Sequence, residues 1–290
     1  MKVAILPSSR VEFDTAVISG GGHLQSIGND VEALIWTDYS RPDLLRETLD
    51  GNPQLKWVQL PFAGVDAFAD VIARAPMFTS AKGAYSEPVA EHALALCLAL
   101  GRAIPERVLA KTWGKKFAVS LYESRVLVIG GGGIANEFKR LVEPFRCPVV
   151  TLGSSDIDRL AEELPKADFV VLACALTDRT KGLIDSQALS LMKSSAYLVN
   201  VARGPIVVTG DLIEALEKGE LAGAALDVTD PEPLPDGHPL WSARNILITP
   251  HTADTDAQVI RMFAARIEAN VRAFCGSGEF IGVVDKKLGY

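Results

Sequence analysis

The sequence lacks several features that mark particular classes of protein. It has no excess of positive charge, since 36 acidic residues outnumber 29 basic ones and give a net charge of −7. Nucleic acids and anionic membranes are bound by clustered Lys and Arg, so we expect no nucleic-acid and no membrane partner. No hydrophobic run reaches the roughly 20 residues of a membrane span, and the N-terminus does not show the pattern of a secretory signal. These absences predict a cytoplasmic location.

Cysteine and histidine are both scarce. Cys97, Cys147, Cys174 and Cys275 lie too far apart for Cys-x-x-Cys metal motifs, and His23, His92 and His238 have no metal-ligand spacing with a carboxylate or thiol. All four thiols lie in apolar or helical contexts, which suits a reduced cytosolic protein better than a disulfide framework. We therefore expect no metal site, and we interpret His92, within an apolar helical stretch, as structural.

The chain does contain two series of short strands that alternate with helices. The length of 290 residues fits two domains of roughly 150 residues each. The expected strands are 3–6, 31–36, 55–60 and 77–80 in the first series, and 125–129, 148–152, 168–173, 196–201, 223–227 and 246–249 in the second. Short β-branched strands alternating with helices predict an α/β fold with two doubly wound parallel sheets. We expect the last helix, 254–274, to pack back on the first domain, so that residues 1–87 and 266–290 form a discontinuous domain and 88–265 a dinucleotide-binding Rossmann domain.

A glycine-rich loop follows the first strand of the second series. Read as Gly-x-Gly-x-x-Gly/Ala, its key positions are Gly130, Gly132 and Ala135, with Gly133 and Ile134 between the last two. The first glycine permits a tight turn, the second allows close approach to a pyrophosphate, and the small third residue permits close helix–strand packing. The helix that follows offers free N–H groups and a partial positive charge. The loop therefore predicts that this domain binds NAD(P).

The end of the second strand bears on the choice between NAD and NADP. An NAD-selective site carries an acid there, about 20 residues beyond the glycine loop, but this chain has Gly153, Ser154 and Ser155. No carboxylate at that place repels a 2′-phosphate, and no Arg follows immediately to bind one. The nearest charged candidates are Asp156 and Asp158, either of which could contact a ribose although each is typical of a helix start, and Arg159 in the next helix. The sequence leans slightly to NADP and leaves NAD open.

Three further segments place polar residues directly after expected strands. They read N-x-x-R-G from Asn200 to Gly204, D-V-x-x-x-E-P from Asp227, and P-H-x-A from Pro250. In open α/β sheets, ligands bind at the carboxyl ends of the strands. With the glycine loop, these motifs in this order closely resemble the D-isomer-specific 2-hydroxyacid dehydrogenase family, in particular its glyoxylate/hydroxypyruvate reductase-like members. The resemblance runs from about Pro61 to the C-terminus.

The resemblance implies a catalytic role for three residues. His251 is the expected acid–base group, Glu232 its partner and Arg203 the residue that binds the substrate carboxylate. The chemistry suits these residue types, because His donates and recovers protons near neutrality and a carboxylate on its other nitrogen favours the protonated form. A guanidinium binds a carboxylate with a two-pronged geometry that Lys does not reproduce.

The resemblance also implies binding residues. The substrate site is expected to include the backbone amides of Ala63, Gly64 and Val65, from a loop of a flavodoxin-like substrate domain. Arg203 and His251 complete that site. A loop over the adenosine carries Ala175 where the family usually has Pro. The expected coenzyme-binding residues are Gly130, Gly132, Gly133, Ile134, Gly153, Ser154, Ser155, Cys174, Ala175, Thr177, Val201, Ala202, Arg203, Asp227 and His251. Family members pair through the apolar helix near residues 87–100, which implies a homodimer.

The expected activity is hydride transfer between a small 2-oxo acid and its D-2-hydroxy acid, with NAD(P) as coenzyme. Glyoxylate and hydroxypyruvate are the first candidate substrates, while phosphoglycerate, D-lactate and other D-2-hydroxy acids stay open. A different class also uses this fold: the C-terminal-binding-protein co-repressors resemble these enzymes and sense dinucleotides. An inert nucleotide-binding scaffold is a third possibility, although it would not need His251, Glu232 and Arg203 together.

Overall fold

The computed structural model describes residues 1–74, 76–115 and 117–286. The chain divides into two compact units, each built on its own parallel sheet. Unit 1 comprises residues 1–85 and 255–290, and unit 2 comprises residues 86–254. The α/β class with two parallel sheets, expected from the alternating strands and helices, is confirmed.

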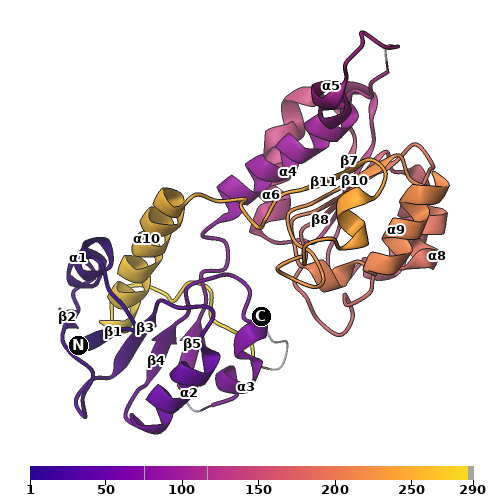
Figure 1. Cartoon of the computed structure of the whole chain (residues 1–290). Coiled ribbons are helices and arrows are strands. Elements are labelled where there is room, and N and C mark those ends of the chain that lie inside the picture. Colours follow the sequence, from indigo (N-terminus) through magenta and orange to yellow (C-terminus); the bar gives the residue numbers. More distant parts are fainter. Residues whose placement is uncertain (75, 116, 287–290) are drawn as a thin grey trace. The chain divides into compact units, whose positions relative to one another are not determined.

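Unit 1 is a five-stranded parallel sheet with helices on both faces. Its strands lie in the order β2-β1-β3-β4-β5, which is the flavodoxin-like order. They are β1 (Lys2–Leu6), β2 (His23–Leu24), β3 (Ala33–Trp36), β4 (Trp57–Gln59) and β5 (Met77–Thr79). Figure 1 shows α1 (Val11–Ser19) and α10 (Asp256–Phe274) on one face, and α2 (Pro42–Asp50) and α3 (Ala69–Ile72) on the other.

The core of unit 1 follows from the alternation of side chains along its strands. Leu34 of β3 packs in one cluster with Leu45 of α2, on the face that α2 and α3 cover. On the opposite face the rings of Phe13 in α1 and Phe263 in α10 meet edge to face, with 5.3 Å between their centroids. Successive strand residues point to opposite faces of the sheet, and most of them are apolar here. Both faces are therefore apolar, and helices cover both faces.

Helix α10 belongs wholly to unit 1. Its buried Asn270 donates to Gln59 Oε1 of β4 at 2.6 Å, and Arg266 donates to the carbonyl of Ser80 at 2.8 Å. These contacts anchor the helix from its middle to its end, so the unit boundary falls before the helix starts, between residues 254 and 255. The sequence placed that boundary between 265 and 266, which would have divided the helix.

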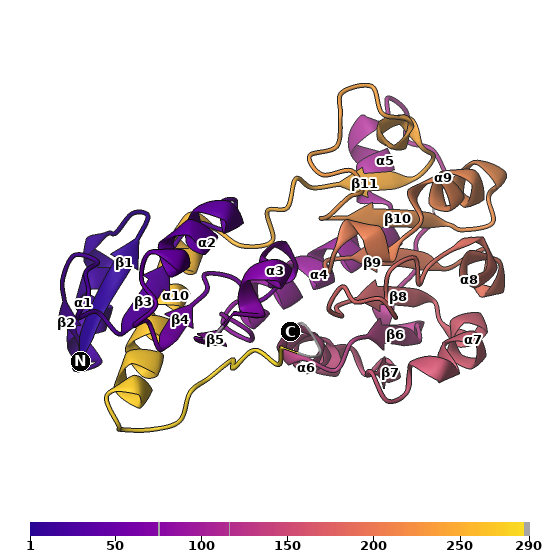
Figure 2. The same cartoon turned by 90° about the horizontal axis from the view of Figure 1, so that it is seen from below.

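Unit 2 is a six-stranded parallel sheet. Its strands lie in the order β11-β10-β9-β8-β6-β7, as Figure 2 shows. They are β6 (Val126–Ile129), β7 (Val149–Leu152), β8 (Phe169–Leu172), β9 (Tyr197–Asn200), β10 (Gly223–Leu226) and β11 (Ile246–Ile248). Its helices are α4 (Ser86–Gly101), α5 (Ile104–Leu109), α6 (Gly133–Val142), α7 (Leu160–Glu163), α8 (Ser186–Leu191) and α9 (Thr209–Lys218).

The sheet of unit 2 is buried on both faces. Val128 of β6 packs with Phe138 of α6 and with α4. The side chain of its neighbour Leu127 points to the other face, where it packs with Leu212 of α9 and with α7 and α8. The chain leaves β6 to form β7 on one side and then crosses to form β8 on the other. The strand order therefore reverses between β6 and β8, and open α/β sheets bind ligands at the carboxyl ends of the strands at such a point.

Candidate active site

The glycine loop lies at the reversal of strand order. Gly130 has a φ of +130°, and a Cβ on it would lie 2.3 Å from the carbonyl oxygen of Ala173, so only glycine fits there. A Cβ on Gly132 would meet no described atom within 4 Å, which leaves open space above the loop. Helix α6 starts at Gly133, and among the described residues no side chain caps its first amides. A tight turn, open space and uncapped amides together fit the diphosphate of a dinucleotide.

The loops that follow β6, β7 and β8 meet at this place. A Cβ on Gly131 would lie 3.5 Å from Gly153 Cα, after β7, and a Cβ on Gly130 would lie 2.9 Å from the backbone nitrogen of Cys174, after β8. Cys174 is half-buried, and burial raises the pKa of its thiol to about 11. The predicted coenzyme residues Gly130, Gly153 and Cys174 therefore lie on loops that meet. Ser154, Ser155, Ala175 and Thr177 follow along the same loops.

The turn that carries Arg203 is organised by a buried amide. Asn200, at the end of β9, accepts from the backbone nitrogen of Ala202 at 3.0 Å and donates to the carbonyl of Arg203 at 2.9 Å. A Cβ on Gly204 would lie 1.9 Å from the carbonyl oxygen of Thr229, which follows β10. The Arg203 turn thus packs backbone to backbone against the loop that carries Glu232, and the side chains of Val201 and Ala202 are buried beneath it.

His251 and Glu232 form a hydrogen-bonded pair. The Nδ1–H of His251 donates to Glu232 Oε1 at 2.6 Å, and the backbone nitrogen of Thr229 donates to Glu232 Oε2 at 3.3 Å. The hydrogen bond that Glu232 accepts raises the pKa of His251 above its ordinary value of 6.5, and the same contact lowers the pKa of Glu232. Both directions agree. The positive charge of Arg203 acts on both groups and lies close to the pair.

Asp227 fixes the backbone on both sides of His251. Its carbonyl accepts from the nitrogen of His251 at 2.8 Å, and its Oδ1 accepts from the nitrogen of Thr252 at 2.9 Å. His251 has a φ of +52°, a left-handed conformation that persists for a non-glycine residue only where its surroundings hold it. The clamp supplied by Asp227 therefore sets the direction in which the imidazole points.

The carboxylate of Asp227 is itself part of a buried network, since its side chain is only 2% exposed. Thr249 Oγ1 donates to it at 2.6 Å, and His92 Nε2 of α4 lies 3.0 Å from Thr249 Oγ1 and 3.3 Å from Asp227 Oδ1. Burial alone would raise the pKa of Asp227, but the hydrogen bonds it accepts, led by that from His92, hold the pKa below its usual value. The structure therefore links His92 to the clamp on His251.

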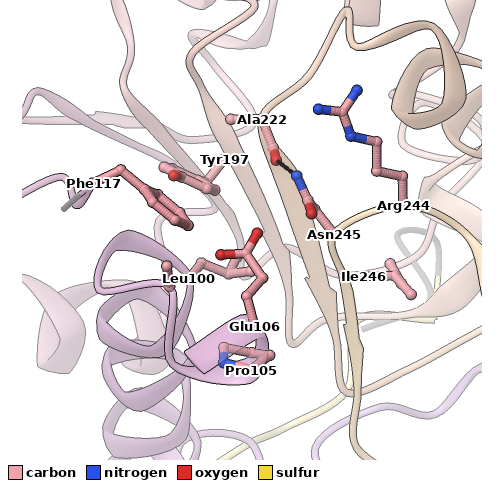
Figure 3. A pocket seen from close by; sticks show the side chains of 10 residues that line it. Leu100, Pro105, Glu106, Phe117, Tyr197, Ala222, Arg244, Asn245 and Ile246 are labelled. Carbon is pink, nitrogen blue, oxygen red and sulfur yellow. Dashed lines mark hydrogen bonds between the residues drawn. The ribbon is translucent and has the colours of Figure 1, made fainter. Parts of the chain in front are cut away.

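A cavity of about 380 Å³ lies in unit 2 away from these residues. It is lined by Tyr197 at the start of β9, by Ala222 just before β10, and by Asn245 just before β11. Figure 3 shows Glu106 of α5 beside it and the hydrogen bond that Asn245 donates to the carbonyl of Ala222. Arg203, Glu232 and His251 follow the opposite, carboxyl ends of the same strands. The cavity is therefore not the predicted site.

A family model for the NAD binding domain of D-isomer specific 2-hydroxyacid dehydrogenases matches residues 93–253, more than half of the chain. The chain belongs to this family. It is an NAD(P)-dependent oxidoreductase that acts on the CH–OH group of donors, with small 2-oxo and 2-hydroxy acids as the substrate class.

Relatives and solved structures match this chain over most of its length. A glyoxylate reductase from Thermofilum pendens is 30% identical, with 78% of this chain and 74% of that protein covered. A Corynebacterium melassecola protein described as lying in the proB 3′ region is 35% identical over 96% of this chain and 97% of its own. The crystal structure of a Xanthobacter autotrophicus D-isomer specific 2-hydroxyacid dehydrogenase with NADPH and MES superimposes with a TM-score of 0.84 at 25% identity, covering 100% and 99% of the two chains.

Within unit 2 the structure brings together the family's motif residues, while the predicted substrate loop lies in unit 1. Val65 is buried in the core of unit 1, and Ala63 and Gly64 beside it are half-buried after β4. Two residues make contacts that the sequence does not indicate. His92, expected to be structural, contacts Thr249 Oγ1 beside the Asp227 carboxylate. Arg179, in the loop after β8, donates to the carbonyl of Ser154, which follows β7.

Two further findings bear on the expectations drawn from absences. In the described part of the chain, no helix combines the length and apolar character needed to cross a membrane. All four cysteines are free thiols, and burial raises the pKa of Cys97, Cys147 and Cys174. Thiols of this kind are poor nucleophiles.

Proposed function

We propose that this enzyme reduces a small 2-oxo acid to its D-2-hydroxy acid, with glyoxylate or hydroxypyruvate as substrate. The observation that carries the proposal is the His251–Glu232 pair at 2.6 Å with the charge of Arg203 beside it. The relative named glyoxylate reductase supports the choice of substrate. A short 2-oxo acid presents one carboxylate and one carbonyl oxygen, which are the two groups that Arg203 and His251 are suited to bind.

Each of the three side chains has a separate task in the proposed reaction. The nicotinamide coenzyme, when bound, supplies the hydride that reaches the substrate carbonyl carbon. Arg203 holds the substrate carboxylate with its fork of N–H donors. His251 donates the proton from Nε2 to the substrate oxygen as negative charge develops there, because its Nδ1 is already engaged by Glu232. Glu232 orients the ring and keeps it protonated.

The coenzyme is held, in this proposal, by the loops after β6, β7 and β8. The amides from Gly130 to Ile134 would hold the diphosphate, and Cys174, Ala175 and Thr177 would contact the adenosine. Backbone at Val201 and Ala202 and the Asp227 region contact the nicotinamide side. We propose a modest preference for NADPH, because Gly153, Ser154 and Ser155 supply no carboxylate at the end of β7.

The substrate carboxylate receives further N–H donors from unit 1 in this proposal. The loop after β4 carries the amides of Ala63, Gly64 and Val65, which would form an anion-binding nest in this proposal. The buried side chain of Val65 and the hydrogen bond from Tyr85 Oη to the carbonyl of Pro61, at 2.8 Å, hold the two ends of this loop. Ala63→Pro removes one donor and tests the proposal through a raised KM for the oxo acid.

The enzyme is proposed to act as a cytoplasmic homodimer. The apolar face of α4 packs in the core of unit 2, so the better candidate contact is the segment that follows it. There Trp113 is 94% exposed, and Val108, Leu109 and Phe117 are also exposed. Several large apolar side chains exposed within one segment favour an interface, and twofold pairing is the commonest oligomer. Light scattering at micromolar concentration should give a dimer for the wild type and a smaller mass for Trp113→Ser; a monomeric wild type contradicts the proposal.

A screen of 2-oxo acids tests the proposed activity. Glyoxylate, hydroxypyruvate, pyruvate and phosphohydroxypyruvate are offered separately with NADH and with NADPH, and absorbance at the nicotinamide band is followed. Fastest turnover with glyoxylate or hydroxypyruvate supports the proposal. Fastest turnover with pyruvate or phosphohydroxypyruvate assigns the enzyme to the D-lactate or phosphoglycerate class. Dinucleotide binding without turnover of any acid supports a sensor like the co-repressors.

A further inference from the structure

The carboxyl end of β7 is reached by a cation from another loop. Arg179, seven residues beyond the end of β8, donates from Nη1 to the carbonyl of Ser154 at 3.2 Å and from Nη2 to Asp158 Oδ1 at 3.3 Å. In a dinucleotide-binding sheet, the hydroxyls of the adenosine ribose lie at the end of this strand. The contact with Ser154 therefore places a guanidinium where a 2′-phosphate would lie.

The backbone that carries Arg179 is firmly held, although the side chain is exposed. Thr180 Oγ1 donates to the carbonyl of Ala175 at 2.7 Å and accepts from the nitrogen of Thr177 at 2.8 Å. These bonds close the loop on both sides of Arg179. A fixed backbone with a solvent-facing guanidinium suits the binding of an exchangeable anion.

The other cation nearby is directed elsewhere. Arg159 was the nearest candidate in the sequence, but its guanidinium pairs with Glu163 at 3.3 Å and with Glu162 at 3.9 Å, both on its own helical turn. Arg159 thus supports the packing of its own segment. Arg159 carries the same charge as Arg179, but its guanidinium points to Glu162 and Glu163 and not to the end of β7. It is therefore a matched control.

A carboxylate also reaches the end of β7, from a position that the usual pattern does not use. Asp156 Oδ2 accepts from Ser155 Oγ at 2.9 Å and lies 3.9 Å from the point where Gly153 would carry a Cβ. In the usual NAD-selective pattern, the acid at the end of the strand would take the position of Gly153. Asp156 therefore occupies the neighbourhood in which a carboxylate accepts hydrogen bonds from free ribose hydroxyls.

We propose that Arg179 is the specificity-determining residue for the 2′-phosphate of NADPH, and that Asp156 serves the free ribose hydroxyls of NADH. This inference rests on the proposed NAD(P) function. When NADPH binds, Arg179 exchanges Asp158 for the phosphate. The exchange is easy because exposed ion pairs are weak, whereas a phosphate monoester carries about −1.5 to −2 charges and accepts strong hydrogen bonds. A cation that favours NADPH and an acid that favours NADH both lie at the end of β7. Their opposite effects account for the weak discrimination between the two coenzymes that the sequence predicts.

Binding of two nucleotides that differ only in the phosphate tests the proposal without turnover. Adenosine 2′,5′-bisphosphate and adenosine 5′-monophosphate are titrated calorimetrically into the full-length protein. Loss of hydrogen bonds to a charged group predicts that Arg179→Gln weakens the bisphosphate by about 10- to 100-fold and changes the monophosphate by no more than about twofold. Arg159→Gln should change neither. Equal effects on both nucleotides, or an effect of Arg159→Gln that matches that of Arg179→Gln, would overturn the assignment.

Variants of the two carboxylates separate their roles. Asp158→Asn frees Arg179 and should tighten the bisphosphate, whereas Asp156→Asn should weaken the monophosphate by more than it weakens the bisphosphate. The reverse order contradicts the division between the two acids. These titrations are independent of the oxo-acid screen: if the enzyme turns over no 2-oxo acid, or prefers NADH, the proposed function changes while the Arg179 ratio still stands or falls by itself.

Discussion

The imidazole of His251 and the carboxylate of Glu232 share a hydrogen bond of 2.6 Å, which raises the pKa of the histidine and lowers that of the acid. Neither effect is local in the sequence, since the two residues follow different strands, β11 and β10. The pair depends on the backbone that Asp227 clamps and on the close approach of Gly204 to Thr229.

The pH dependence of the reaction follows from the raised pKa of His251. Reduction of an oxo acid consumes a proton, so the protonated imidazole is the active form in that direction. A raised pKa keeps that form present above the ordinary value of 6.5, and the rate falls as the pH rises through the raised pKa. Oxidation of the hydroxy acid needs the neutral ring and rises over the same range.

Glu232→Gln tests this cause directly. The amide has the shape of the acid but no charge, so the pKa of His251 should fall and the declining limb of the reduction profile should move to lower pH. Profiles of kcat/KM for the variant, the wild type and the surface control Glu220→Gln measure the shift. An unmoved limb in Glu232→Gln would assign the titration to another group.

Arg203→Lys should lower kcat/KM for the oxo acid by about 10- to 100-fold, because the charge survives but the two-pronged geometry does not. The coenzyme Kd should change less than kcat/KM for the oxo acid. Arg244→Lys, which alters an exposed cation beside the cavity at the opposite end of the strands, is the control and should keep wild-type kinetics. Near-normal activity of Arg203→Lys would transfer the substrate carboxylate to another cation.

Gly204→Ala should destabilise the protein as well as the site. The new methyl group would lie 1.9 Å from the carbonyl oxygen of Thr229, and the backbone on both sides must move to admit it. Overpacking of this kind costs about 1–3 kcal/mol, which thermal unfolding detects as a lower Tm. Gly210→Ala adds the same methyl group on α9 where no described atom lies within 4 Å, and it should leave the Tm unchanged or raise it. Equal Tm values for the two variants would contradict the packing argument.

Gly153→Asp should raise the KM for NADPH by about tenfold or more and alter the KM for NADH far less. The new carboxylate would stand at the strand end, where it repels a 2′-phosphate and accepts from ribose hydroxyls. Gly153→Ala separates charge from size, since its Cβ would have no described neighbour closer than 3.9 Å. A wild type that already prefers NADH by orders of magnitude would show that Asp156 governs the choice.

Local pattern predicted much of the fold. The buried β-branched runs and the glycine loop identify β6 and α6 because strand burial and turn geometry depend on neighbouring residues. Helix α1 and the short α3 and α5 were not predicted, since short helices are stabilised by tertiary packing more than by their own residues. The resemblance implies the roles of the motif residues after β9, β10 and β11 and the pairing of Glu232 with His251. It does not indicate the hydrogen bonds from the side chains of Asn200 and Asp227 that hold these loops.

Long-range contacts account for what the sequence did not predict. His92 and Thr249 are 157 residues apart, and Arg179 and Ser154 are 25 apart on neighbouring loops. No periodicity or motif spacing connects such residues, because only the folded sheet brings their loops to one edge. From the sequence, only residues that directly follow β7 can be predicted to lie near its end. The sequence therefore indicates Arg159 and not Arg179.

The most direct test of the account compares turnover and coenzyme binding in His251→Ala. The variant removes the proposed proton donor and leaves the glycine loop and α6 intact. We predict that kcat for reduction of the preferred 2-oxo acid falls by about 10²- to 10⁴-fold, while the NADPH Kd from fluorescence titration stays within about threefold of the wild type. A loss of NADPH affinity as large as the loss of kcat, or turnover close to that of the wild type, would contradict the assignment of His251 as the acid–base group.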